Sequence, residues 1–522
     1  MADRFWVGGT STWNATAGSK WALTSGGAGG EAVPTASDDV YFDASSGAGT
    51  ITISGARTCL NLDCTGFTGD IAGTGGLTIS ASMTFSGTMA SSHSGTYTFN
   101  ATSGTNTITT AGNSLTNSFT FNGVGGTWEL SDPLETTGTI TLTNGTFNLN
   151  GFDTVCSIFS SSNSNTRTFD ISNSFLTITG ASTTVWNTAT TTNFTFTSSG
   201  SLVETTGSSI IISPNTIAFE ELNFRGTNPT VTVISRLTSS STEINGTGTL
   251  VLDGGFTFLA DSFTPNSSTV SCTNAGTTAI NKNVTFYNFT VAKNGGTVNT
   301  NTGFTVQNTF FVANGAFDAN DQNISLGKFN SATDTFARSI AMGSGTWTIT
   351  GTGTIWDITT HVNLTITQET STINITDSSA TAKTFAGAGE AYNNITFSGD
   401  NITVSGANTF ATMAVNNAGL TNGLKLTHSV TQTVTGFTTN GSVGNLCKIV
   451  STSSGTAATL SKTTGTVNAS YMSLQDSAAD GGATWNALNS TNVSGNTGWV
   501  FSDPPASSAS RNGRMGLLMG AY

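Results

Sequence analysis

The amino-acid sequence predicts an all-β protein folded as a right-handed parallel β-helix, or β-solenoid, and three observations support this fold class. Large apolar residues alternate with Thr or Asn along many short segments. Gly, Asn and Ser interrupt these segments at short intervals, as turns between strands require. A long part of the chain also repeats itself at one fixed offset. With 522 residues the chain exceeds one ordinary domain, so it contains several domains or grows by repetition.

Alternation with a period of two is the signature of a strand with one buried face. In each such segment two large apolar side chains point one way, and the Thr or Asn between them points the other. We find no helical pattern longer than one or two turns. The clearest alternating segments are Ile51-Thr52-Ile53, Leu77-Thr78-Ile79, Ile140-Thr141-Leu142, Phe147-Asn148-Leu149, Phe194-Thr195-Phe196, Phe304-Thr305-Val306 and Ile402-Thr403-Val404.

The repeat has an offset of 170 residues, which places Phe119 on Phe289 and Trp186 on Trp356. After a three-residue slip the match continues, and residues 222–226 fall on 395–399. Chance matches between Thr-rich segments would not align Trp, Phe and Asn-Gly at one offset. We interpret the pattern as a tandem duplication in which 119–226 is copied as 289–399.

A duplication inside an unbroken strand-turn pattern is typical of a solenoid. Apolar side chains of successive coils stack inside, while Thr and Asn stand outside, and hydrogen bonds between coils satisfy the backbone. The surface can then be neutral, which explains why only 9% of the residues are charged. The competing fold is an array of antiparallel sandwiches, which predicts hairpins and separable domains of about 100 residues.

The two ends differ from the middle. Trp6, Trp13 and Trp21 lie in a Trp-rich N-terminal segment that could cover the first open coil. The expected division is therefore a cap at 1–45, a β-helix shaft at 46–466, closing coils at 467–503, and a linker with a short docking tail at 504–522.

Composition excludes several classes of protein. The net charge of −13 leaves too few cations for a nucleic-acid-binding face. With 61 Gly but only 7 Pro and no three-residue period, the chain is not collagenous. Helical enzymes and coiled coils need more Glu, Lys and Leu. A content of 36% hydrophobic residues, including 32 Phe, supplies a core and argues against disorder.

The chain opens with Met1-Ala2-Asp3-Arg4-Phe5-Trp6-Val7-Gly8-Gly9, which lacks a charged and then apolar leader. We therefore expect synthesis in a host cytoplasm without a signal peptide, and release by another route, such as assembly into a virus particle freed by lysis. Because no run of about 18 apolar residues exists, we expect no membrane-spanning segment.

The five cysteines are scattered, and we expect them to be single buried thiols, with a bridge or metal role as the alternative. Three histidines without a close Cys or His partner argue against zinc. We expect neither a metal nor a cofactor. The cysteines are Cys59, Cys64, Cys156, Cys272 and Cys447.

At this point the ends resemble a known group. The opening Phe5-Trp6-Val7-Gly8-Gly9, the segment Asp38-Asp39-Val40-Tyr41-Phe42-Asp43 and the closing Asn496-Thr497-Gly498-Trp499 resemble a module of tailed-phage virion proteins and some bacterial surface proteins. Residues 59–69, 381–387 and 474–485 are similar to further parts of it. The resemblance implies a long β-solenoid virion component, such as a tail fibre or head fibre, and carries over no catalytic residue.

Glycoside hydrolysis needs two carboxylates at set distances, so the acidic residues were considered as catalytic candidates. In the cap a carboxylate more often binds turn amides. Glu220 and Glu221 are adjacent, so a strand would send them to opposite faces, and Asn393 and Asn394 replace them in the second copy. We predict no catalytic residue. The candidates considered are Asp38, Asp39, Asp43, Glu129, Asp132, Glu135, Glu220 and Glu221.

Two further groups are candidate contact sites. The tryptophans of the repeat region either fill the core or stack on a glycan; they are Trp128, Trp186, Trp347 and Trp356. The C-terminal tail is a small cationic and apolar peptide, either a disordered terminus or a segment that docks on a virion protein or trimer partner. Its residues are Arg511, Arg514, Met515, Leu517, Leu518, Met519 and Tyr522.

Taken together, the sequence predicts a non-enzymatic structural protein of a phage particle, a fibre or decoration that mediates host-surface attachment or particle adhesion. Expected partners are other virion proteins of the capsid or tail and a host surface glycan, with neither nucleic acid nor membrane, in a homotrimer located in the virion. The alternatives are a bacterial surface adhesin and a polysaccharide-degrading tailspike.

Overall fold

The computed structural model describes residues 1–14, 18–234, 237–244, 246–252, 257–258, 262–273, 275–333 and 336–502. It forms two compact units. The first unit comprises Met1–Thr305 and Asn314–Phe317, and the second comprises Val306–Ala313 and Asp318–Tyr522.

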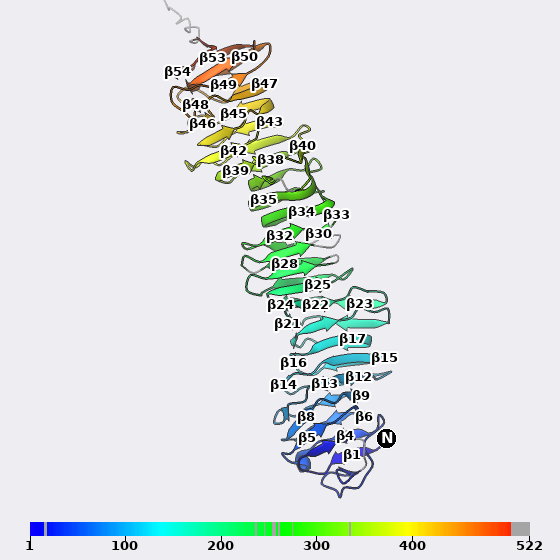
Figure 1. Ribbon diagram of the computed structural model, residues 1–522. Coiled ribbons are helices and arrows are strands. Elements are labelled where there is room, and N and C mark those ends of the chain that lie inside the picture. The colour runs from blue at the N-terminus through cyan, green and yellow to red at the C-terminus, as the bar shows by residue number, and fades with distance from the viewer. Residues whose placement is uncertain are drawn as a thin grey trace, which may run out of the picture. The chain divides into compact units, whose positions relative to one another are not determined.

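Unit 1 is a stack of parallel coils (Figure 1). Strand β12 (Tyr97–Phe99) pairs with β9 (Leu77–Ile79) of the preceding coil and with β15 (Phe119–Leu130) of the following one. The register aligns equivalent positions, so Leu77, Tyr97 and Phe119 lie above one another and all three are buried. The alternating apolar residues therefore stack into inward columns, which confirms the predicted β-solenoid.

Two smaller sheets form further faces of unit 1. The first has four strands: β2 (Ser11–Trp13), β5 (Thr50–Ile53), β8 (Asp70–Gly73) and β11 (Ala90–Ser91). The second has eight strands: β14 (Ser114–Leu115), β16 (Leu134–Thr136), β18 (Thr154–Cys156), β21 (Phe175–Ile178), β24 (Leu202–Thr205), β26 (Phe219–Phe224), β28 (Ser239–Ile244) and β31 (Ser262–Thr264).

Unit 2 is built in the same way. Strand β43 (Ala391–Phe397) pairs in parallel with β41 (Thr372–Ile375) and with β45 (Thr409–Val415). The final coils add a three-stranded parallel sheet, in which Val467 lies beside Trp485 and Trp485 beside Trp499. Its strands are β50 (Thr466–Ser470), β53 (Thr484–Leu488) and β55 (Trp499–Ser502).

Nearly all strand pairs are parallel. Strand β1 (Asp3–Trp6), by contrast, pairs with β3 (Trp21–Ala22) in an antiparallel ladder. The described helical structure is the single 3-10 turn η1 (Ala44–Ser46). The antiparallel sandwich alternative is therefore wrong, because the segments pair with the next coil rather than with their neighbours in sequence.

The N-terminal tryptophans fill the first coils of unit 1. Trp6, Trp13 and Trp21 are all buried, and the Trp21 ring centroid lies 5.2 Å from those of both other indoles. Phe42 packs against the same cluster, with its ring centroid 6.0 Å from that of Trp6. These rings therefore form one buried aromatic cluster in the first coils.

The duplication recurs in the structure. Strand β22 (Thr183–Asn187) and strand β39 (Gly353–Asp357) both carry a register shift directly before their buried tryptophan, Trp186 or Trp356. Each is followed by a short strand with the same alternation of half-buried and exposed residues, β23 (Phe194–Thr197) and β40 (Leu364–Thr367). Local backbone irregularities were therefore copied together with the sequence.

The five cysteines are free and buried, as expected. Burial raises the pKa of Cys156 to about 12 and that of Cys272 to about 12. We expect none of the five thiols to react with Ellman's reagent in the folded chain at pH 8, and all five to react in guanidinium. Absorbance of the released thiolate measures both states, and rapid labelling of the folded chain would contradict the described burial.

Candidate functional site

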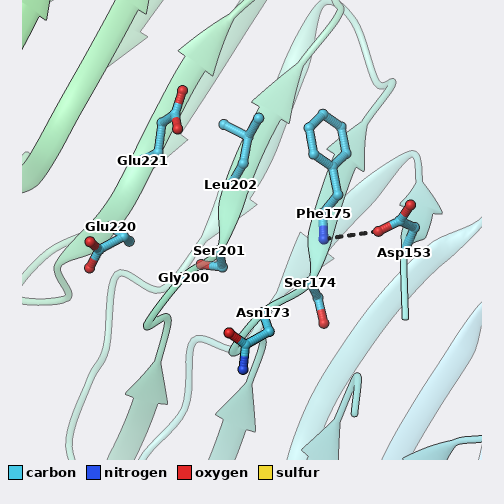
Figure 2. A pocket seen from close by; sticks show the side chains of 9 residues that line it. All are labelled: Asp153, Asn173, Ser174, Phe175, Gly200, Ser201, Leu202, Glu220 and Glu221. Carbon is cyan, nitrogen blue, oxygen red and sulfur yellow. Dashed lines mark hydrogen bonds between the residues drawn. The ribbon is translucent and has the colours of Figure 1, made fainter. Parts of the chain in front are cut away.

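An open groove of about 410 Å³ lies on the eight-stranded face of unit 1, where strands of three successive coils begin. Figure 2 shows its lining side chains. They are Asp153, Asn173, Ser174, Phe175, Gly200, Ser201, Leu202, Glu220 and Glu221.

Three outward-facing side chains, one from each of three neighbouring strands, form the floor of the groove. Register places Phe175 of β21 beside Leu202 of β24, and Leu202 beside Glu221 of β26. All three side chains are half-buried, whereas the next residue of each strand faces the core. The coil stacking therefore sets an aromatic ring, an aliphatic chain and a carboxylate in one line.

Turn residues form the edge of the groove. Asn173 has a φ of 59° and Gly200 a φ of 68°, so the two turns bend in the left-handed region directly before β21 and β24. Asp153 precedes β18, and its Oδ1 accepts a hydrogen bond from the Phe175 amide at 3.2 Å (Figure 2). This bond fixes the Asp153 carboxylate beside the aromatic ring.

The structure corrects our expectation for the paired glutamates. Phe219 and Leu222 are buried, and both Glu220 and Glu221 between them lie on the solvent side and line the groove. The strand therefore departs from strict alternation at this point. Glu221 Oε1 accepts a hydrogen bond from Asn223 Nδ2 at 2.7 Å, which orients that carboxylate, while Glu220 is exposed.

The second copy provides an internal comparison. Strand register places Thr346 and Thr372 of unit 2 where unit 1 has Phe175 and Leu202. The three acidic positions correspond to amides, Asn323 for Asp153, and Asn393 and Asn394 for Glu220 and Glu221. The scaffold is shared, so the acidic and aromatic lining belongs to the first copy alone.

The other acidic candidates hold the fold together. Asp38 is buried, and its carboxylate accepts from the Ala2 amide at 2.9 Å and from the Thr35 amide at 3.0 Å. Asp43 Oδ1 caps η1 by accepting from the Ser45 amide at 2.9 Å. The remaining four bind neighbouring coils: Asp39 accepts from Asn61, Asp132 from Thr110, Glu129 from Asn148 and Glu135 from Ser114.

Asp38 makes stability depend on pH. Burial by itself raises its pKa, but hydrogen bonds from Thr35 and Ala2 and the charge of Arg4 outweigh burial and hold the pKa below its usual value. The folded pKa thus lies under the unfolded value of about 3.9. Stabilisation by the ionised carboxylate is therefore present above that pH and is lost as the pH falls through the folded pKa. Replacing Asp38 with Asn should flatten the acid side of a plot of the urea midpoint against pH, and an unchanged slope would contradict this assignment.

The four repeat-region tryptophans are core residues, and their assignment as glycan contacts is wrong. Trp128, Trp347 and Trp356 are 0% exposed and Trp186 is 1% exposed, so no indole face is open to a sugar ring. Their stacking partners are other aromatic rings of neighbouring coils, such as Phe329, whose ring centroid lies 4.3 Å from that of Trp356. Each ring occupies an inward position of a strand whose side chains alternate between core and solvent.

The remaining expectations concern the C-terminal tail, metal binding and membrane-spanning segments. The docking tail, with Arg511, Arg514, Met515, Leu517, Leu518, Met519 and Tyr522, lies outside the described residues. No group of three or more His, Cys, Asp or Glu side chains is placed to hold a metal ion in the described part of the chain. The described residues also include no helix long and apolar enough to cross a membrane.

Sequence reasoning missed four buried cations among the described residues, of which one is Lys293 in β34 (Thr285–Thr300). Arg167 and Arg338 occupy inward positions of β20 (Arg167–Asp170) and β37 (Arg338–Ala341), and Lys383 does so in β42 (Lys383–Ala386). Lys383 Nζ lies 2.7 Å from the Asp377 carboxylate. The signal was present, because each cation stands at an apolar position of a period-two segment.

Comparison with known proteins gave no family assignment. No model of a protein family, no curated protein and no solved structure matches this chain.

Proposed function

We propose that this chain is a structural protein of a tailed-phage particle, a fibre or decoration that displays a β-solenoid to the host surface. The observation that carries the proposal is the continuous stacking of apolar columns within each unit, joined coil to coil by parallel hydrogen bonds. Such stacking suits a stiff shaft, because every coil is held by its two neighbours. The resemblance of both ends to phage virion modules supports the same role.

The sparsely charged outer surface agrees with this role. Outward positions such as Thr78, Thr98 and Thr120 are aligned by register in successive coils, with a hydroxyl at each step. Repeated weak contacts from such a surface add up through multivalency when many copies are displayed on one particle.

Within this role, we propose that the groove is where the shaft contacts a host glycan. Phe175 is partly exposed and offers its ring to a sugar, and the carboxylates of Asp153, Glu220 and Glu221 can accept hydrogen bonds from sugar hydroxyls. A volume of about 410 Å³ is in the range of small-ligand sites.

Particle imaging tests the role. Purified particles from cells that express the chain should carry immunogold label on capsid or tail, and their peptides should include this chain. Label on cells without particles would favour the bacterial adhesin, and absence of the chain from every particle would overturn the proposal.

Glycan binding tests the groove. The purified chain, incubated with host capsule or lipopolysaccharide, should bind it without releasing oligosaccharide. A variant carrying Phe175→Thr, Glu220→Asn and Glu221→Asn, which copies the second repeat at these three positions, should lose the binding. Glycan binding retained by this variant would exclude the groove as the binding site. Release of oligosaccharide would favour the tailspike alternative.

A further inference from the structure

Each unit contains a strand of the large sheet that pairs with the preceding coil only. Strand β23 pairs with β20 of the preceding coil, and β40 pairs with β37 (both are labelled in Figure 1). No described strand of the following coil pairs with either one. By contrast, β22 and β39, which come directly before them in the chain, are paired on both sides.

A shortening of the next coil leaves these edges uncovered. After β22 the chain runs through residues 188–201, which include β23, but after β25 (Ser209–Ser213) residues 214–218 lead directly into β26. In unit 2, residues 358–371 include β40, whereas residues 387–390 connect β42 to β43. The apolar side chains of both edges are consequently half-exposed, unlike their buried equivalents in fully paired coils.

The hydrogen bonds of β23 identify its open backbone groups. The Arg167 amide donates to Asn193 O at 3.0 Å and the Ile171 amide donates to Thr197 O at 2.9 Å. Because alternate residues of a strand direct their backbone groups to opposite sides, residues 194, 196 and 198 face away from β20. The Phe194 amide and Ser198 O are used in turns, with Thr191 O and the Ser201 amide.

Four backbone groups therefore remain directed outward on β23: the N–H and C=O of Phe196, the C=O of Phe194 and the N–H of Ser198. Unit 2 repeats the pattern, since the Arg338 amide donates to Asn363 O at 2.8 Å and the Met342 amide to Thr367 O at 2.9 Å. Its corresponding outward groups belong to Leu364, Ile366 and Gln368.

This set of groups is self-complementary. In an antiparallel pair centred on Phe196, the two copies of Phe196 exchange both hydrogen bonds, and each Ser198 N–H donates to the Phe194 C=O of the other copy. All four groups are then satisfied by a two-fold contact. We propose that β23 and β40 are strand-pairing edges that bind a second copy of this chain.

The side chains of both edges favour the same partner. Natural proteins protect open edges with Lys, Pro or inward charges, but neither Phe-Thr-Phe-Thr nor Leu-Thr-Ile-Thr carries any. An uncharged edge needs no oppositely charged partner and can pair with itself.

Unit 2 also exposes apolar surface beside its edge. Phe336 is 50% exposed and Val362 is 62% exposed, and the carbonyls of both accept from Arg338 Nη1. In unit 1 the equivalent acceptors belong to the polar residues Asn165 and Thr192. A second copy paired at β40 would cover this apolar pair.

Site-specific cross-linking tests the register. Pairing centred on Phe196 places Thr195 of one copy opposite Thr197 of the other, and both side chains are exposed. A mixture of full-length Thr195→Cys and Thr197→Cys chains should therefore oxidise to a disulfide-linked dimer, whereas Thr195→Cys alone should not. The native cysteines are buried and do not interfere. A mixture of Thr195→Cys with Thr367→Cys reports pairing between β23 of one copy and β40 of the other.

Charged substitutions on β23 and β40 test whether the chains associate through these strands. Light scattering of the wild-type chain should give the mass of at least a dimer, because each chain carries two such edges. Lysines at Thr195, Thr197, Thr365 and Thr367 should return it to a monomer, because like charges then lie directly opposite. Glutamates at the same four positions should do the same, and mixing the Lys and Glu chains should restore the dimer.

Matched controls are Thr183→Lys in β22 and Thr354→Lys in β39, which are exposed on strands paired on both sides and should leave the dimer intact. A monomeric wild-type chain would overturn the proposal, as would a trimer whose mass the four lysines do not change. The proposal is independent of the phage role, and it would stand if the chain were found on a cell surface instead.

Discussion

Replacing Arg167 with Met should lower the free energy of unfolding of unit 1 by about 3–5 kcal/mol. Arg167 is 1% exposed, and its guanidinium lies over the Phe194 ring, 4.8 Å from the centroid. Its nitrogens donate to Ser161 Oγ and to the carbonyls of Ser161, Asn165, Thr190 and Thr192. The side chain thus ties the turns of two coils together, and without it these carbonyls lose buried donors.

Arg338 makes the same set of bonds in unit 2, to Ser331 Oγ and to the carbonyls of Ser331, Phe336, Thr360 and Val362. Arg338→Met should therefore destabilise unit 2 to a similar degree. Urea unfolding monitored together with hydrogen exchange of the turn amides measures both effects, since solenoids can unfold locally.

A lysine at position 167 separates the effect of the positive charge from that of the guanidinium geometry. Arg167→Lys keeps the positive charge but lacks the planar fork that reaches several carbonyls at once, so it should recover only part of the stability. A Met variant as stable as the wild type would show that water replaces the guanidinium at these turns.

The second large effect is expected at Trp356. Trp356→Ala should lower the free energy of unfolding of unit 2 by about 3–5 kcal/mol, because the cavity opens in a fully buried aromatic column. The indole contacts Phe329 and Phe385, with ring centroids 4.3 Å and 5.6 Å away, and Nε1 donates to Tyr392 Oη at 3.2 Å. Denaturant unfolding followed by circular dichroism measures the loss.

Trp186→Ala in the first copy provides a matched variant. This indole is also buried, lies 4.7 Å from the Phe159 ring centroid and donates to Thr188 Oγ1 at 3.0 Å. The two losses should be similar if the repeats share one packing scheme. Weakened glycan binding at unchanged stability would instead restore the sugar-stacking interpretation of these rings.

The candidate groove was only partly predictable. Glu220 and Glu221 were identified as unusual acidic residues, and their replacement by amides in the second copy was visible in the sequence. Asp153 and Phe175 were missed, because they join the glutamates only through coil stacking. The expected opposite orientation of the glutamates failed because both side chains lie outward at the start of β26, where strict alternation does not hold.

The tryptophans show the opposite case. Their position in period-two segments already favoured the core, and the structure confirms that interpretation at all four positions. The buried arginines obeyed the same period, but an arginine at an inward position gives no local sign of which carbonyls it will meet. For Arg167 those carbonyls come from the turn that precedes β20 in its own coil and from the equivalent turn of the following coil.

By itself the sequence determined that this chain is all-β, that its coils stack in parallel and that one block was copied, because period two, turn residues and the 170-residue offset are properties of neighbouring or repeated positions. Only the tertiary structure decided which coil is shorter than the one before it. That difference uncovers the edges of β23 and β40, while the register of stacked coils brings Asp153, Phe175 and Glu221 to one groove. Both features arise where residues from successive coils meet.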